Sequence, residues 1–208
     1  MAKKWTVYEA YLKTGDWHVH TNFTDGENTI SELCESAEEL GIKLIAFTEH
    51  VRRNLDYNFN ELLSEVDSAR KKFNLKILVG CEAKVLDLDG NIDAPRKIIE
   101  KCDVVLSGFH SFPEVSKKDY LKTLENLLKN PSVDVWAHPT LYSQRHGIKL
   151  TKNEMESIIN SCIENQVLIE ENIKYNLPKP EFLALTKKLG AKTVVGSDAH
   201  KVSELVKR

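Results

Sequence analysis

Short apolar runs alternate with longer segments that repeat apolar residues at helical spacing along almost the whole chain. Runs rich in Val, Ile, Leu and Phe predict strands, and the segments with apolar residues three and four positions apart predict amphipathic helices. The predicted strands cover residues 16–20, 43–47, 76–84, 104–110, 133–138, 167–172 and 192–197. Because a helical segment follows each of the first six strands and a short tail follows the last, the pattern predicts seven strand and helix units.

Capping residues indicate where several of these helices begin and end. Capping boxes run from Thr29 to Glu32 and from Thr151 to Glu154, Gly41 ends the first helix, and Pro180 begins the last long one, which ends at residue 189. The other predicted helices cover residues 61–73, 94–101 and 116–129. Strict alternation of strands and helices predicts a parallel sheet, either closed into a barrel or open and doubly wound.

Polar residues at the strand ends decide between these two arrangements. Six of the seven histidines lie at or just past the carboxyl end of a predicted strand, and Glu82 and Asp198 lie in the same kind of position. An open sheet would hold its first and last strands far apart, whereas a closed barrel brings all strand ends to one rim. Side chains of a strand alternate between faces, so His18 and His20 point the same way, and we expect the same of Asp198 and His200. The sequence therefore predicts a metal site at the mouth of a seven-stranded barrel.

The residue types limit the kind of metal. Imidazole and carboxylate without thiolate are typical of catalytic zinc, manganese or iron sites. A single histidine beside an apolar run is usually an ordinary buried polar residue. The prediction therefore depends on the joint placement of these residues, and it leaves the identity of the ion open.

Length, charge and cysteine use narrow the class of protein. The 208 residues, 41% hydrophobic and 29% charged, predict a single domain over residues 1–208. A net charge of −2, from 29 basic and 31 acidic residues, predicts no broad attraction to nucleic acid. Four widely spaced cysteines predict a protein without disulfides or thiolate metal ligands. The absence of an apolar leader and of a long apolar stretch predicts a cytoplasmic protein that does not enter a membrane. These features do not decide whether the chain forms a homo-oligomer, which is possible.

Several spaced motifs resemble those of the polymerase and histidinol phosphatase (PHP) family of metal-dependent phosphoesterases. They are Asp16-Trp17-His18-Val19-His20-Thr21 with Asp25-Gly26, Thr48-Glu49-His50, Glu82, His110, and Gly196-Ser197-Asp198-Ala199-His200. The resemblance covers nearly the whole chain. It implies an α/β fold, a distorted seven-stranded parallel (β/α)7 TIM-like barrel, and up to three divalent metal ions (Zn, Mn or Fe).

The resemblance also implies a division of the ligands among the ions. Glu82 would bridge two of them, and the full implied set is His18, His20, Glu82 and Asp198 for the first ion, Glu82, His110 and His138 for the second, and Asp25, His50 and His200 for the third. Two positions depart from the family pattern. Glu49 stands where the family usually has aspartate, and Asp25 stands where some relatives have histidine.

The implied activity is hydrolysis of a phosphate ester, most simply a small phosphomonoester, as a histidinol phosphatase performs. Closely spaced ions lower the pKa of bound water to about 7 and neutralise the phosphate, so a metal-bridging hydroxide near Glu82 could attack phosphorus. Asp198 or His200 could pass a proton to the leaving oxygen. The predicted catalytic residues are therefore Glu82, Asp198 and His200.

Basic residues near the predicted mouth are candidates for substrate binding. Arg52 and Arg53 follow His50, and Arg145 and His146 lie in the segment after His138. Arginine matches phosphate in a bidentate fashion, so we expect at least one of these residues to contact a small phosphorylated substrate. Irregular segments at 51–60, 86–93 and 140–150 should shape the pocket, and residues 4–13 could cover one flank of the barrel.

Three other functions remain open. A PHP-type nuclease or oligonucleotide phosphodiesterase would use the same metals but predicts a basic, aromatic-lined groove. A barrel amidohydrolase or deaminase shares the His-x-His motif but needs an eighth strand. A non-enzymatic, metal-stabilised accessory domain would tolerate loss of ligands, whereas the full set is present here.

Overall fold

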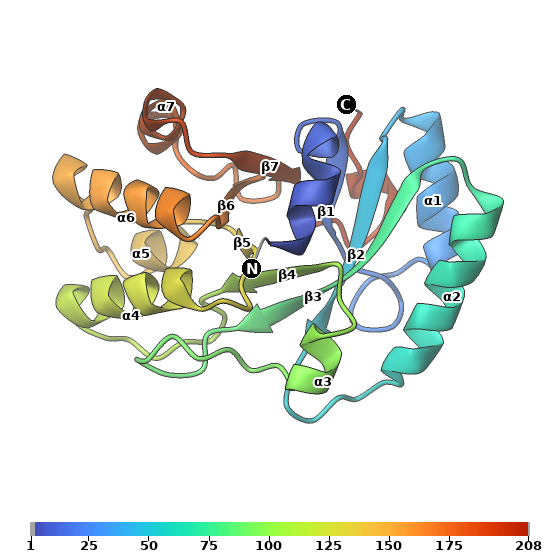
Figure 1. Ribbon diagram of the computed structural model, residues 1–208, viewed down its shortest axis with the longest axis horizontal. Coiled ribbons are helices and arrows are strands. Elements are labelled where there is room, and N and C mark those ends of the chain that lie inside the picture. The colour runs from blue at the N-terminus through green and yellow to red at the C-terminus, as the bar shows by residue number, and fades with distance from the viewer. Residues whose placement is uncertain (1–2, 208) are drawn as a thin grey trace.

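A computed structural model describes residues 3–207 of the chain (Figure 1). Within these residues seven parallel strands follow one another in sequence order around a nearly closed sheet, and helices lie outside it. The predicted seven-stranded (β/α) barrel is confirmed. The strands are β1 (Gly15–Val19), β2 (Leu44–Val51), β3 (Lys76–Lys84), β4 (Val104–Gly108), β5 (Val135–Trp136), β6 (Leu168–Asn172) and β7 (Thr193–Gly196).

Contacts between β1 and the chain just after β7 close the barrel. The backbone N–H of His20 donates to the carbonyl of Ala199 at 2.9 Å, and that of Asp198 donates to the carbonyl of His18 at 2.8 Å. The Asp16 carboxylate accepts the N–H of Ser197 at 2.9 Å. Closure therefore places the first and last sequence motifs side by side.

The helices begin largely where the capping residues predict. Both capping boxes form, Pro180 begins α7, and Gly190 ends it with a left-handed φ of +81°. The helical elements are η1 (Lys4–Tyr11), α1 (Ile30–Glu39), α2 (Phe59–Lys72), α3 (Arg96–Ile99), α4 (Lys117–Lys129), α5 (Leu141–Arg145), α6 (Lys152–Glu164), α7 (Pro180–Leu189) and η2 (Val202–Glu204). The short α5 lies in a segment predicted to be irregular, and five residues are too few to show helical periodicity.

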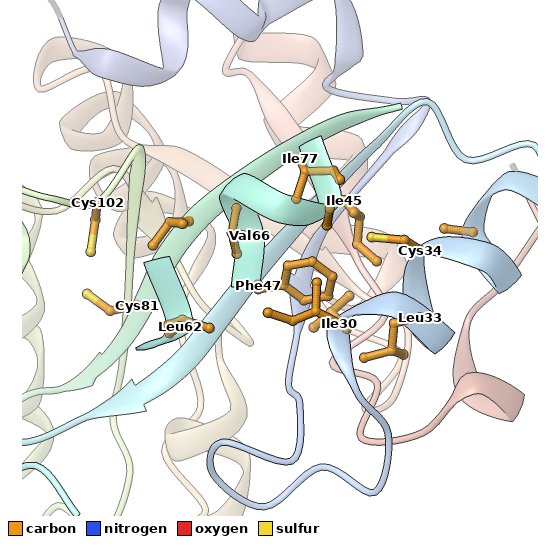
Figure 2. Close-up of a cluster of buried hydrophobic side chains, with 14 of the residues drawn as sticks. Ile30, Leu33, Cys34, Ile45, Phe47, Leu62, Val66, Ile77, Cys81 and Cys102 are labelled. Atoms are coloured by element: carbon orange, nitrogen blue, oxygen red, sulfur yellow. The ribbon is translucent and has the colours of Figure 1, made fainter. Parts of the chain in front are cut away.

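The hydrophobic core has one part inside the barrel and two parts outside it. Figure 2 shows the outer part beneath α1 and α2, where Ile30 and Leu62 lie near Phe47 of β2. A second outer cluster lies between the strands and α4, α6 and α7, and it contains Trp136, which packs 6.0 Å from the Phe182 ring. Each large side chain buried in this way contributes about 1.5–3 kcal/mol. Trp17 is also fully buried, in the cluster inside the barrel.

The amino-terminal segment closes the barrel end opposite the predicted site. Trp5 joins the interior cluster, and its indole N–H donates to the carbonyl of Gln166 at 3.0 Å, just before β6. The Lys4 ammonium donates to the carbonyl of Cys102 at 2.7 Å, just before β4. The segment therefore covers one end of the barrel, where the sequence suggested a flank.

Two observations bear on the environment expected for the protein. None of the helices within residues 3–207 combines the length and apolar character needed to cross a membrane. All four cysteines are buried as free thiols.

Candidate metal centre

All nine predicted ligands gather at the carboxyl mouth of the barrel. They fall into three groups, and within each group the candidate ligand atoms lie within 4.8 Å of one another. The groups are His18, His20 and Asp198; Glu82, His110 and His138; and His20, Asp25, His50 and His200. His20 belongs to two of the groups, and Glu82 of the remaining group lies within 3.6 Å of His18, His20 and His50, so the three form one continuous cluster.

The Glu82 carboxylate connects the first two groups. Its Oε2 lies 3.5 Å from His18 Nε2 and 3.6 Å from His20 Nε2. Its Oε1 lies 2.9 Å from the Nε2 atoms of His110 and His138. Oε2 also lies 3.1 Å from His50 Nδ1. The two oxygens of one buried side chain therefore face different histidines, as the bridging role requires.

The third group lies at the outer rim. Asp25 Oδ2 is 3.3 Å from His50 Nε2 and 3.4 Å from His200 Nε2, and 53% of the Asp25 side chain is exposed. Asp25 is thus the most exposed of the nine candidate ligands, since the side chains of the other eight are at most 27% exposed.

Glu49 supports the loop that carries Asp25. Its buried carboxylate accepts the backbone N–H of Thr21 at 2.9 Å and the hydroxyl of Thr24. Burial raises the pKa of Glu49 to about 7 despite these hydrogen bonds. Although residue 49 departs from the family pattern, it still carries a carboxyl group, and that group supports the loop through its hydrogen bonds with Thr21 and Thr24.

The donor set fits divalent cations. The Nδ1 atom of His20, which faces Asp25 of the third group, is buried and has no hydrogen-bond partner among residues 3–207, an unfavourable arrangement that a bound cation would relieve. Burial, reinforced by His18, holds the pKa of His20 well below its ordinary value. Burial alone would raise the pKa of Glu82, but His110 and His18 outweigh it and hold that pKa well below the ordinary value. Neutral imidazole and ionised carboxylate are the forms that bind metal.

Two candidate ligands have left-handed backbone conformations. The φ angles of His138 and Asp198 are +31° and +56°, and such conformations cost non-glycine residues about 1–3 kcal/mol. Asp198 and His200 lie beyond Gly196, where β7 ends. From the sequence we expected Asp198 and His200 to point the same way because they alternate along a strand. That reason is wrong, because both lie past the strand, and the turn at Asp198 sets their direction instead.

The predicted substrate-binding residues have different surroundings. Arg52 lies against the cluster, since its guanidinium donates to the carbonyl of Glu82 at 3.2 Å. Arg53 is 68% exposed and pairs with Asp93 at 3.8 Å. His146 packs 4.2 Å from the ring of Tyr142 and belongs to none of the ligand groups found in residues 3–207.

Lys174 and Tyr175, in the loop after β6, are site residues that the sequence analysis missed. The Lys174 ammonium lies 3.2 Å from Asp198 Oδ1 and 3.2 Å from His200 Nδ1. The Tyr175 ring lies 6.1 Å from that of His138, and the Arg145 guanidinium lies 5.6 Å from the Tyr175 ring centre. A basic and aromatic edge thus borders the cluster.

Two polar residues inside β6 were also missed. The Glu170 carboxylate lies 2.6 Å from His18 Nδ1, and the Asn172 amide donates to Asp198 Oδ2 at 3.3 Å. Both are buried. Their spacing of two within an apolar strand was the available signal, because it places both on the face that points into the barrel.

The barrel and its mouth define a metal-dependent barrel enzyme. Residues 16–174 match the model of the PHP domain, a segment that holds all the candidate ligands except Asp198 and His200. The chain belongs to the PHP domain family, which confirms the resemblance seen in the sequence.

Individual relatives agree with this assignment. A probable phosphatase of Acetivibrio thermocellus is 29% identical over 202 residues, covering 89% of this chain and 78% of the relative. The DNA polymerase/3'-5' exonuclease PolX of Bacillus subtilis is 28% identical over 92% of this chain, which spans only 35% of that protein. The fold resembles that of a histidinol phosphate phosphatase from Lactococcus lactis, which was solved with zinc, L-histidinol and phosphate. The two structures match with a TM-score of 0.69 and 20% sequence identity, over 91% of this chain and 88% of the other.

Proposed function

We propose that this chain hydrolyses a small phosphomonoester with the help of up to three divalent metal ions at the barrel mouth. The observation that carries the proposal is the continuous cluster of three ligand groups joined through His20 and Glu82. A structural metal site needs only one closed set of ligands, whereas joined sites are typical of enzymes that act on phosphate.

Membership in the PHP family and relatives named probable phosphatase support the general activity. These relatives are 26–29% identical to the chain, and the chain covers 75–78% of their length. The prediction of a PHP-family phosphatase is confirmed at this level. The choice of a small monoester is our own inference, and it is supported by the nearly balanced charge of the chain.

Each ligand group has a role in this proposal. His18, His20, Glu82 and Asp198 would hold one ion, Glu82 with His110 and His138 a second, and Asp25, His50 and His200 a third. When bound, the ions would supply an activated water at neutral pH and would neutralise phosphate charge. Glu82, which is buried and faces both inner groups, would keep those groups at a fixed separation.

Basic side chains would orient the phosphate. Lys174 lies after β6 and Arg52 after β2, and both border the cluster. They could therefore donate hydrogen bonds to the nonbridging oxygens of the phosphate. Arg145 lies farther out, over Tyr175, where it could contact the rest of the substrate. We assign Arg53 and His146 weaker roles, because Arg53 is 68% exposed and His146 packs against Tyr142 outside the ligand groups found in residues 3–207.

The leaving oxygen needs a proton. His200 is 21% exposed, and Asp198 lies 3.7 Å from its Nδ1 atom. Because His200 is on the open side of the cluster, it could deliver a proton to the departing alcohol when the third site is empty, while Asp198 holds the imidazole in place; with the third ion bound, His200 would be a ligand and water would supply the proton.

A substrate panel tests this function. Protein reconstituted with zinc, manganese or iron is incubated with phosphomonoesters including histidinol phosphate, and inorganic phosphate is measured. Glu82→Gln should abolish release, whereas Glu171→Gln, the same change on the outer side of β6, should leave it intact. Absence of release from every monoester with all three metals would contradict the proposal.

The similarity to PolX favours one second candidate, an exonuclease that uses the same cluster. The same preparation would be given a short single-stranded oligonucleotide labelled at its 5' end. Nucleotide release from the 3' end that exceeds monoester hydrolysis in kcat/KM would favour the exonuclease over the phosphatase.

A further inference from the structure

One carboxylate inside the barrel touches residues of two different ligand groups. Glu170 projects inward from β6 and is fully buried. Its Oε1 lies 2.6 Å from His18 Nδ1, and its Oε2 accepts the backbone N–H of His138. His18 belongs to the first ligand group and His138 to the second.

The neighbouring strand β7 leaves room for this carboxylate. Gly196 lies on β7 beside Glu170, and a Cβ atom there would come 2.8 Å from the Cβ of His18 and closer still to Glu170 Oε1. Because the φ angle of Gly196 is not left-handed, backbone conformation does not require glycine at this position. The requirement is space for the Glu170 and His18 pair.

The hydrogen-bond chemistry explains why residue 170 is a carboxylate. The His138 backbone N–H can only donate. His18 Nε2 points into the first ligand group, 3.1 Å from His20 Nε2, so a metal-binding Nε2 must carry no proton and Nδ1 must donate. Glu170 thus faces two donors, and a carboxylate offers two acceptor oxygens. A glutamine would turn its own N–H2 group toward one of them.

We infer that Glu170 is a positioning residue that holds His18 as the Nδ1–H tautomer and fixes the backbone of His138, so that one side chain orients ligands of two ions. Such hydrogen bonds to metal-bound histidines fix the ring and raise its basicity, and losing one typically weakens metal binding by about 10–100-fold. This inference depends on the metal site of the proposed function but not on its substrate.

The neighbouring residue supplies a matched control. Glu171 points to the outer side of β6, where it pairs with Lys13 and accepts the hydroxyl of Thr193 at 2.6 Å. Glu170→Gln and Glu171→Gln make the same chemical change one position apart, on opposite faces of the strand.

The test measures zinc affinity by competition with a chromophoric chelator, without substrate. Circular dichroism of the metal-free proteins checks that both variants fold. We expect Glu170→Gln to bind zinc about 10–100-fold more weakly than wild type, and Glu171→Gln to match wild type. A folded Glu170→Gln variant with wild-type affinity would overturn the inference.

The tautomer of His18 gives a second readout that a purely structural role would not change. In zinc-loaded wild-type protein with 15N-labelled histidine, NMR should show a proton on His18 Nδ1, and a His18 bound through Nδ1 would overturn the inference. This measurement holds even if Glu170→Gln fails to fold. Wild-type protein that binds zinc with the predicted tautomer but hydrolyses no phosphate ester would refute the proposed function and leave this inference standing.

Discussion

Gly108, the last residue of β4, should be intolerant of a single added methyl group because of its position beside His138. A Cβ atom at this position would lie 2.9 Å from His138 Nε2 and 3.1 Å from Nδ1, and closer still to Cε1. The φ angle of Gly108 is not left-handed, so alanine fits the backbone and the conflict is steric. Gly108→Ala therefore perturbs one candidate ligand without removing any polar atom.

The expected size of the effect follows from these distances. Optimal carbon contacts lie at about 3.5–4.0 Å, so the His138 ring must move by roughly 1 Å. Glu82 Oε1, 2.9 Å from His138 Nε2, and the Tyr175 ring restrict that movement. Metal–nitrogen distances tolerate changes of only about 0.2 Å. We expect loss of the ion in the second group, a fall of about 100-fold in kcat, and about 1–3 kcal/mol lower stability.

Gly80→Ala is the control for crowding alone. Its Cβ would lie 2.8 Å from Thr48 Cγ2 and from the carbonyl of Val104, and its three nearest atoms belong to no candidate ligand. Metal content by elemental analysis, phosphate release and thermal unfolding in chelator would be measured for both variants. Gly80→Ala should lose stability but keep its metal. A Gly108→Ala protein with wild-type metal content and rate would refute the reasoning.

Three further predictions concern other parts of the molecule. Burial raises the pKa of Asp134 to about 6, above its unfolded value, so the folded state binds more protons and stability should fall as pH rises from about 4 to 6; denaturant unfolding across that range should show this fall in wild type and a smaller fall in Asp134→Asn, where the buried Glu49, with a pKa of about 7, still contributes in the same direction. Lys174→Met removes a cation beside Asp198 and should raise KM about 10–100-fold in steady-state assays, with metal content unchanged. Asp25→Ala should lower the bound metal by one equivalent by elemental analysis, because only the outer group contains Asp25; loss of all metal would contradict separate groups.

The sequence predicted the barrel and the convergence of its ligands because both follow from local patterns. His18 and Asp198 are 180 positions apart, yet His18 lies in the first predicted strand and Asp198 follows the last, and closure of a parallel barrel must bring these strands together. The capping boxes likewise fixed the starts of α1 and α6, because the interactions are confined to four residues.

The surroundings of the ligands could not be predicted in the same way. Glu170 and Glu171 are adjacent and identical, and only the register of β6 against its neighbours decides which faces His18. Arg53 follows Arg52 directly, but its pairing with Asp93 depends on how the loop after β3 folds back. These contacts are tertiary, so no pattern within a short window encodes them.

Metal analysis combined with turnover tests the central claim most directly. Purified chain, reconstituted and freed of loosely bound ions, would be assayed for metal content and for phosphate release before and after treatment with a chelator. We expect more than one and up to three bound ions per chain, and activity that disappears with the metal and returns when it is restored. A chain that binds no metal, or that hydrolyses phosphate esters equally well after complete chelation, would contradict the claim.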